Sequence, residues 1–456
     1  MAKVQFEPPA DRQRPERWLL LCAGLAVVGL IFMQTAEPTE EPRAGAGTLT
    51  ATATSAAAGE ATARPRCREA GAAVGVRVEA EDDAATSLGA GGEAPTFLPF
   101  SVEVGRGAPR GTEPGFVVGV KRHRDGAPWA EVFLVDDRAE GGRLVPLARS
   151  RGDLGPPVVA ASSQGWVAGV LEPHAAGFEL RLVRASGDDE LTWGASFEQG
   201  RDESLAVDIA LGERGGIAVW DEVVEKGARA VVQLAGFDEG LGVSSEARVV
   251  SGDAEDADLP RAVSFDGGYW VTWISRSKGG AKRSGSGGGR YAAERIEPSR
   301  VRVLLLDRDG EVVGAPRAVT PIDGYVAAYD AAMVGAQLLV AWRDDDTPLG
   351  AHGGELSTIS LSVSGEGEIQ PVAKDDLGAG VPLVLGRWLV VPGRGRDQRM
   401  APMDTTGVLV GLPQVEPALR GSQLLGQRGG TFLAARPAGR SSELHVVRCD
   451  PSLSPL

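Results

Sequence analysis

Seven carboxylates recur along the chain, each just ahead of a run of small residues, and they are its best candidates for chemistry. They stand roughly fifty residues apart. If they gather at one mouth of a folded body, they create a negative potential that suits a cation such as Ca²⁺ or a basic peptide. An aspartate in this position also commonly shapes its own turn by accepting backbone N–H bonds. The residues are Glu93, Asp153, Asp202, Asp258, Asp323, Asp376 and Glu416.

Signals for catalysis are weak elsewhere. A glycoside hydrolase needs two carboxylates flanking its bond, and no pair is marked among the many acids. The acidic clusters at 253–258 and 344–346 lack the spacing of a calcium-binding EF-hand loop, and 307–310 holds only a fragment of it. Four histidines and three cysteines disfavour a zinc site or a c-type haem. We therefore assign no catalytic residue.

The carboxylates belong to a repeated phrase of two predicted strands. Each copy has an acidic turn, a strand of small residues, a glycine, and a strand built around Trp or Phe, as in LPRAVSFDGGYWVTW from Leu259. A strand repeat of this period is typical of a β-propeller, whose inner strands need small residues and whose second strands pack blade against blade. The second-strand aromatics are Phe116, Trp166, Trp220, Trp273, Trp342, Trp388 and Phe432.

The fold class predicted is all-β, a β-propeller of seven four-stranded blades. Six or eight blades stay open, because the first copy, at Phe97, is weak. Third strands are expected from Phe178 and from Val301, and RDGEVVG at Arg308 is expected to turn from a third to a fourth strand. A basic, Gly- and Ser-rich insertion at 275–299 should separate the second and third strands of one blade. It is either a contact surface for an anionic partner or a solvated loop.

The chain ends predict how the ring closes. The last copy stops after a third strand that ends at Cys449, while Val74 to Ala80 forms an orphan strand before the first copy. If the orphan strand completes the last blade, it runs antiparallel to Glu443–Cys449, and Cys67 and Cys449 flank the junction. In an oxidising compartment these two cysteines are expected to form a disulfide; the alternative is two free thiols.

The N-terminus predicts a membrane anchor. Residues 1–17 form a basic cytoplasmic tail, 18–36 a transmembrane signal anchor around the apolar Trp18–Met33 run, and 37–66 a low-complexity linker ahead of the propeller at 67–456. A cleaved signal peptide is the alternative. The expected location is the cytoplasmic membrane, crossed once, with the C-terminal domain in the periplasm or outside.

Glycine pairs ahead of the second strand give the chain a loose resemblance to kelch-type propellers among exported bacterial repeat proteins. The pairs are Gly215-Gly216, Gly267-Gly268 and Gly429-Gly430. The resemblance implies an architecture and transfers no catalytic residue, because propellers serve as platforms, scaffolds and enzymes.

The function predicted is an envelope-anchored platform that binds a protein or glycan partner. The alternatives are a carbohydrate-active hydrolase or lyase using carboxylates at the channel mouth, and a structural part of an envelope assembly. The net charge of −15 disfavours nucleic acid. No cofactor is expected, with Ca²⁺ the only candidate considered.

Overall fold

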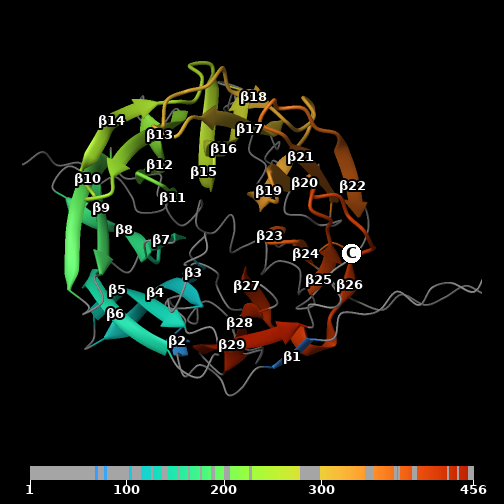
Figure 1. The fold of residues 1–456 in the computed structure, drawn as a ribbon, viewed down its shortest axis with the longest axis horizontal. Coiled ribbons are helices and arrows are strands. Elements are labelled where there is room, and N and C mark those ends of the chain that lie inside the picture. The colour runs from blue at the N-terminus through green and yellow to red at the C-terminus, as the bar shows by residue number, and fades with distance from the viewer. Residues whose placement is uncertain are drawn as a thin grey trace, which may run out of the picture.

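The protein folds as a ring of seven antiparallel sheets (Figure 1). The computed structural model describes residues 67–69, 77–79, 102–104, 115–124, 127–135, 142–150, 155–162, 165–174, 177–185, 190–199, 206–224, 229–277, 298–344, 354–373, 377, 381–392, 398–428, 431–438 and 441–449. Residues 1–66, with the predicted tail, anchor and linker, lie outside the described residues. Among the residues described, no helix is long and apolar enough to cross a membrane.

Each sheet is one blade, and its strands follow one another in chain order. Blade 1 contains β3 (Val102–Val104), β4 (Phe116–Arg124), β5 (Ala127–Val135) and β6 (Gly142–Arg149). Blade 2 contains β7 (Val158–Ser162), β8 (Gly165–His174), β9 (Gly177–Ala185) and β10 (Leu191–Gln199). Blade 3 contains β11 (Val207–Gly212), β12 (Gly215–Val224), β13 (Arg229–Asp238) and β14 (Val243–Val249). Blade 4 contains β15 (Glu255–Phe265), β16 (Gly268–Ser277), β17 (Ser299–Leu306) and β18 (Arg317–Ala318). Blade 5 contains β19 (Val326–Val334), β20 (Gln337–Asp344), β21 (Glu355–Leu361) and β22 (Ile369–Ala373). Blade 6 contains β23 (Leu383–Leu385), β24 (Trp388–Pro392), β25 (Gln398–Pro402) and β26 (Gln414–Val415). Blade 7 contains β27 (Gln423–Arg428), β28 (Thr431–Ala438) and β29 (Ser441–Cys449), with β1 (Cys67–Glu69) and β2 (Arg77–Glu79) paired to β29.

The predicted order of strands within a blade is confirmed. The first strand of each sheet lies around the centre of the ring and the last lies at its periphery (Figure 1). All seven predicted aromatics fall on second strands, and the third strands predicted at Phe178 and Val301 are β9 and β17. The insertion separates β16 from β17, as expected, although residues 278–297 lie outside the described part.

Seven apolar clusters hold the ring together, one at each junction between neighbouring blades. Side chains alternate along a strand, so a second strand feeds two junctions. In β12, Ala218 and Trp220 pack toward blade 2, whereas Ile217 and Val219 pack toward blade 4. Trp220 is fully buried. Both faces of a blade are therefore core, which explains why its second strand reads as a nearly continuous apolar run.

Two buried carboxylates on inner strands also join neighbouring blades. Asp208 on β11 accepts hydrogen bonds from Ile209 N at 2.9 Å and, in the next blade, from Ala262 N at 3.0 Å. Asp330 occupies the equivalent position on β19 and accepts one from Val384 N of blade 6 at 2.8 Å. Each therefore satisfies a backbone donor at a blade junction, where an unpaired N–H is costly.

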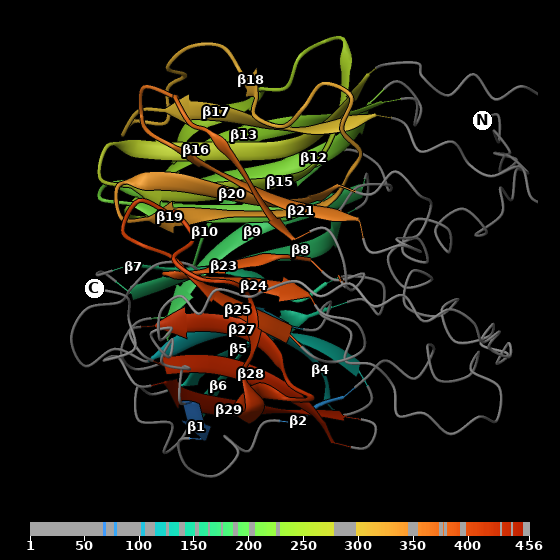
Figure 2. The ribbon, with the colours of Figure 1, turned by 90° about the vertical axis from the view of Figure 1, so that its right-hand side faces the viewer.

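The ring closes through the N-terminal strands. Arg77–Glu79 pairs antiparallel with β29 from Ser441 to Glu443, and Cys67–Glu69 pairs with its other end. The sequence assigned this outer strand to Val74–Ala80; the described pairing covers part of that segment and reaches seven residues further back, to Cys67. Blade 7 thereby gains its outer strand, lying beside β29 in Figure 2.

The register places Cys67 directly opposite Cys449. Directly opposed residues have Cβ atoms about 4.5–5.5 Å apart, close to the separation that a disulfide needs. We predict that the body from Arg66 onward, purified without reductant, has no titratable thiol. Reduction should lower its thermal midpoint, with an upper bound of about 5 kcal/mol on the lost stability.

The double variant Cys67→Ser/Cys449→Ser is the control, because its thermal midpoint should not change when reductant is added. Two reactive thiols in the unreduced body, measured by alkylation and mass spectrometry, would show that the cysteines are unpaired.

Removing the carboxylate of Asp208 should destabilise the ring. Asp208→Ala leaves the N–H groups of Ile209 and Ala262 without their acceptor, which should cost about 1–3 kcal/mol in the free energy of unfolding. Asp208→Asn keeps one acceptor oxygen and should lose less. Chemical denaturation measures both, with the exposed Glu239→Ala as the control; equal stability of all three variants would contradict a role at the junction.

Candidate functional site

We call the side of the ring where inner strands begin and second strands end the loop face, and the opposite side the turn face. Of the seven predicted acids, Asp258, Asp323 and Glu416 are described, and all three stand on the loop face at or before an inner strand. The other four, Glu93, Asp153, Asp202 and Asp376, lie outside the described residues.

Asp258 is the most unusual of the three. Its Oδ2 forms an ion pair with Arg276 of the neighbouring β16, whereas its Oδ1 is buried without a hydrogen-bond partner. The side chain as a whole is 27% exposed. Burial raises the pKa of Asp258, and the charge and hydrogen bond of Arg276 only partly oppose that shift. Asp258 therefore keeps one buried carboxylate oxygen without a hydrogen-bond partner, beside the channel mouth.

The next residue, Leu259, has a strained backbone and an exposed side chain. Its φ of 53° is rare outside glycine, and it lies in an irregularity of β15 between Asp258 and Arg261. Both neighbouring blades fix this conformation: Leu259 N donates to Asp221 Oδ2 at 3.2 Å, and the Tyr329 hydroxyl donates to Leu259 O at 2.6 Å. The aliphatic side chain, 39% exposed, is thus held at the mouth.

Blade 5 presents a similar combination. Ile322 is 76% exposed, and Asp323 follows it in the turn that precedes β19. Behind them, Asp344 accepts hydrogen bonds from Tyr325 N at 2.5 Å and from Trp342 Nε1 at 3.2 Å. Burial raises the pKa of Asp344, and the charges of Glu355 and Asp323 add to the rise. The charges of Glu355 and Asp323 therefore disfavour the ionisation of Asp344.

Exposed aliphatic residues recur at the same place in three successive blades. Leu259, Ile322 and Val381 each stand at or just before the inner strand of blades 4, 5 and 6, and Val381 is 41% exposed. We call the group Asp258, Leu259, Ile322, Asp323 and Val381 the mouth cluster. It combines carboxylates with apolar side chains, which is suited to a ligand carrying both positive charge and apolar surface.

Glu416 behaves as a turn residue. It is buried, and its carboxylate and carbonyl accept from Ala418 N at 3.4 Å and Leu419 N at 3.0 Å, at the start of the 3₁₀ turn η6 (Pro417–Leu419). The acids that the sequence grouped together therefore have different environments. Within the described part of the chain, no group of three or more His, Cys, Asp or Glu side chains could hold a metal ion.

The sequence analysis missed the residues that shape this site. Asp221 and Tyr329 come from blades 3 and 5, yet both bond to Leu259 of blade 4. The available signal was a polar group in an apolar run, as Asp221 directly follows the buried Trp220. Which backbone group each one bonds follows only from the packing of the blades.

The chain was compared with protein-family models, curated proteins and solved structures. No family model matches, and no curated protein matches either. Similar solved structures include a Penicillium chrysogenum α-L-arabinanase complexed with arabinobiose, 10% identical, TM-score 0.44, covering 77% of this chain and 95% of that one. A virginiamycin B lyase from Staphylococcus aureus is 10% identical, TM-score 0.39, covering 74% and 95%. A GH43 endo-arabinanase from Bacillus licheniformis is 15% identical, TM-score 0.28, covering 57% and 92%.

These likenesses concern the fold alone. Their TM-scores all lie below 0.5, so they do not test the kelch resemblance, which stays a prediction from the sequence. The glycine pairs have a local cause: Gly215 and Gly268 adopt φ of 131° and 146° where the chain turns into the second strand. Such backbone is favourable only for glycine, so the pairs at Gly215 and Gly268 serve the turn.

The raised pKa of Asp258 predicts a pH dependence of stability. The folded state holds this proton more tightly than the unfolded chain, so stability falls as pH rises from about 3.9, the unfolded pKa, to the folded pKa. Asp258→Asn removes that loss. The stability of the variant relative to wild type should therefore increase with pH across this window and then level off. Denaturation at several pH values measures it, with the exposed Glu246→Gln as the charge control; a pH-independent difference would contradict the raised pKa.

Proposed function

We propose that this chain is an anchored binding platform whose mouth cluster takes a ligand with positive charge and apolar surface, such as a basic peptide segment. The observation that carries the proposal is the recurrence of exposed Leu259, Ile322 and Val381 at one mouth, beside Asp258 and Asp323. Contiguous exposed apolar patches that are rimmed by polar residues mark interaction sites.

The strain at Leu259 supports this proposal. A non-glycine residue at positive φ persists only where its surroundings hold it, and such residues cluster at binding sites. Here the hydrogen bonds of Asp221 and Tyr329 fix the backbone of Leu259, and the residue remains 39% exposed. A residue that served the core would have been turned inward.

A hydrolase or lyase has less support. The inner-strand carboxylates Asp208 and Asp330 are buried and accept backbone N–H bonds across junctions. Asp258 is ion-paired with Arg276, and Asp344 accepts from Tyr325 and Trp342. Each of these four carboxylates therefore has a structural partner, whereas a hydrolase needs two carboxylates facing one substrate bond.

The cellular setting belongs to the same proposal. An apolar run after a basic tail, followed by a linker poor in apolar residues, would hold the propeller outside the cytoplasmic membrane. A tethered ring is suited to capturing a partner or joining an envelope assembly. We favour capture, because an assembly role alone gives no reason for the composition of the mouth cluster.

The test measures binding of a blocked tetrapeptide of alternating Leu and Lys to the body from Arg66 onward. We expect weak binding that falls at high salt, because charge and apolar contact both contribute. Ile322→Ser/Asp323→Asn should lower the affinity at least tenfold without changing the thermal midpoint, since both residues are exposed. Titration calorimetry measures the affinity.

The matched control is Thr192→Ser/Glu198→Gln, on the outer strand of blade 2, where both residues are exposed. This control should bind the tetrapeptide as the wild type does. A mouth variant with unchanged affinity, or a Leu–Glu tetrapeptide that binds equally well, would overturn the proposal.

A further inference from the structure

A second surface lies at the outer edge of the ring, on the connections from third to fourth strands. Twelve large aliphatic residues of the described chain are exposed; three belong to the mouth cluster and nine lie on these connections or on outer strands. Seven of the nine follow one another through blades 4 to 6. We call these seven the apolar rim: Val312, Val313, Val363, Ile369, Val408, Val410 and Leu412.

The rim reverses the pattern expected of an outer edge. After the turn at 404–407 that follows β25, Val408, Val410 and Leu412 have exposed fractions of 37%, 46% and 79%. Between the first two, Leu409 packs against the cluster at the junction of blades 5 and 6. A solvated edge would alternate apolar inside with polar outside. Here both sides are apolar.

Blade 2 provides an internal comparison. Its outer strand β10 exposes Thr192, Ser196 and Glu198 and buries Ala195 and Phe197. The connection that precedes it reads SGDDE from Ser186. Blades 2 and 6 pack against their neighbours by the same rules, so packing between blades does not require the exposed valines of the rim.

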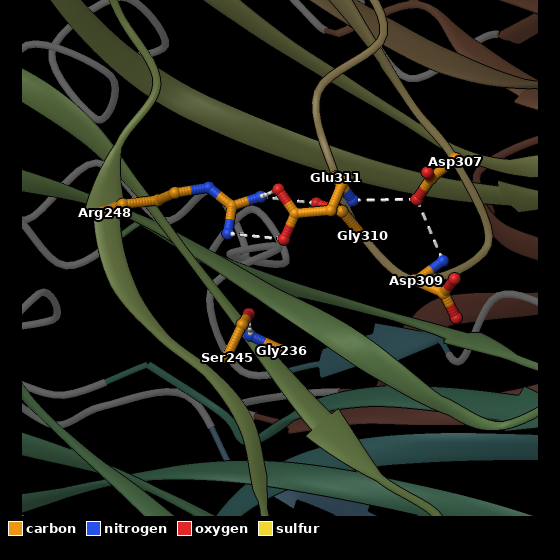
Figure 3. A network of polar contacts seen from close by, with 7 residues as sticks. All are labelled: Gly236, Ser245, Arg248, Asp307, Asp309, Gly310 and Glu311. Carbon is orange, nitrogen blue, oxygen red and sulfur yellow. Dashed lines mark hydrogen bonds and ion pairs between the residues drawn. The ribbon is translucent and has the colours of Figure 1, made fainter.

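Contacts with the preceding blade hold two of the three connections in place. Arg248 of blade 3 donates to Gly310 O at 2.6 Å and pairs with Glu311 in the connection of blade 4 (Figure 3). In blade 5, Ser360 Oγ donates to Thr406 O at 2.5 Å in the connection of blade 6. The connections of blades 4 and 6 thus rest on the preceding blade, and β18, β22 and β26 follow one another along one side of the ring in Figure 1.

The turns at the start of these connections are held firmly. Asp307 Oδ1 accepts from Asp309 N at 3.0 Å and from Glu311 N at 2.9 Å, as Figure 3 shows. Asp404 accepts in the same way from Thr406 N and Val408 N, and the Thr406 hydroxyl holds the pKa of Asp404 below its usual range. The rim is therefore preorganised, which lowers the entropic cost of binding.

The charges around the rim define the partner. The three connections, 307–316, 362–371 and 404–415, contain six acids and one base, Arg308. From neighbouring strands, Arg248 pairs with Glu311 and the charge of Arg387 acts on Asp404, so the acids still outnumber the bases. An anionic membrane or a nucleic acid would be repelled by this surface. Two copies joined through the rim by a twofold axis would face acid with acid, because such an interface is self-complementary. The complementary partner has aliphatic side chains flanked by Lys or Arg.

We propose that the apolar rim of blades 4 to 6 docks a protein segment rich in aliphatic and basic residues. The site is separate from the mouth cluster, because it occupies the periphery of the turn face whereas the mouth cluster surrounds the channel on the loop face. The chain would then be an adaptor with two contact surfaces. This proposal rests on the exposed residues and charges of the rim and is independent of the ligand proposed for the mouth cluster.

The probe is a peptide of about sixteen alternating Leu and Lys residues, which extends roughly 50 Å as a strand and can reach across several blades. We expect it to bind the body from Arg66 onward, and Val408→Ser/Val410→Thr/Leu412→Ser to weaken that binding at least tenfold. The variant should keep the thermal midpoint of the wild type, since all three side chains are exposed. Fluorescence anisotropy measures the affinity.

Two controls separate the surfaces. The mouth variant Ile322→Ser/Asp323→Asn and the blade 2 variant Thr192→Ser/Glu198→Gln should each keep at least half of the affinity for the long peptide. If the mouth variant lost binding and the rim variant bound as the wild type does, the proposal for the rim would be overturned and the proposal for the mouth cluster would stand. Sedimentation that shows a dimer broken by the rim variant would identify a second copy as the occupant and overturn the proposal.

Discussion

Every blade has two apolar faces, and this constraint governs the rest of the structure. A sheet that is apolar on both sides must have a neighbour on each side, so a row of such sheets is stable only when it closes. The seven apolar clusters show the outcome, with one at every junction, including that between blades 7 and 1. Closure depends on β1 and β2, which add the outer strand that blade 7 lacks.

Closure also decides where polar groups belong. At the blade junctions, Asp208 and Asp330 accept backbone donors of the next blade, and Asp221 and Tyr329 bind the backbone of Leu259 from either side. These groups are buried or partly buried and must be paired. Side chains without such duties are left for the two ends of the channel and for the outer edge, where binding surfaces can vary without disturbing the ring.

The repeat makes variation informative. All blades solve the same packing problem, so a departure confined to some of them needs another cause. Exposed aliphatics lie at the mouth of blades 4 to 6 and on the outer edge of blades 3 to 6, where blade 3 contributes Val243 and Val249. The outer strand of blade 2 instead exposes Thr192, Ser196 and Glu198. The two surfaces lie on opposite faces of the same three blades, and we interpret this half of the ring as its binding half.

The sequence by itself determined the architecture. The alternation of small inner strands with aromatic second strands predicted the blades, because each strand type meets a local steric demand that its own residues reveal. The placement of Trp220 and Trp342 on second strands, and the separation of β16 from β17 by an insertion, could be read in this way. Counting strands at the chain ends predicted that an N-terminal strand completes the last blade near Cys449, whereas the register of Cys67 against Cys449 came from the structure.

Only the tertiary structure decided which acids differ from one another. Asp258 and Glu416 precede their strands in similar phrases, yet Asp258 has an unpartnered buried oxygen and Glu416 closes a turn. The difference arises from neighbours distant in the chain, and a hydrogen bond between blades leaves no local pattern. The exposure of Leu259 and of the rim valines was hidden for the same reason: a valine reads as core until the surface that would cover it is found to be absent among the described residues.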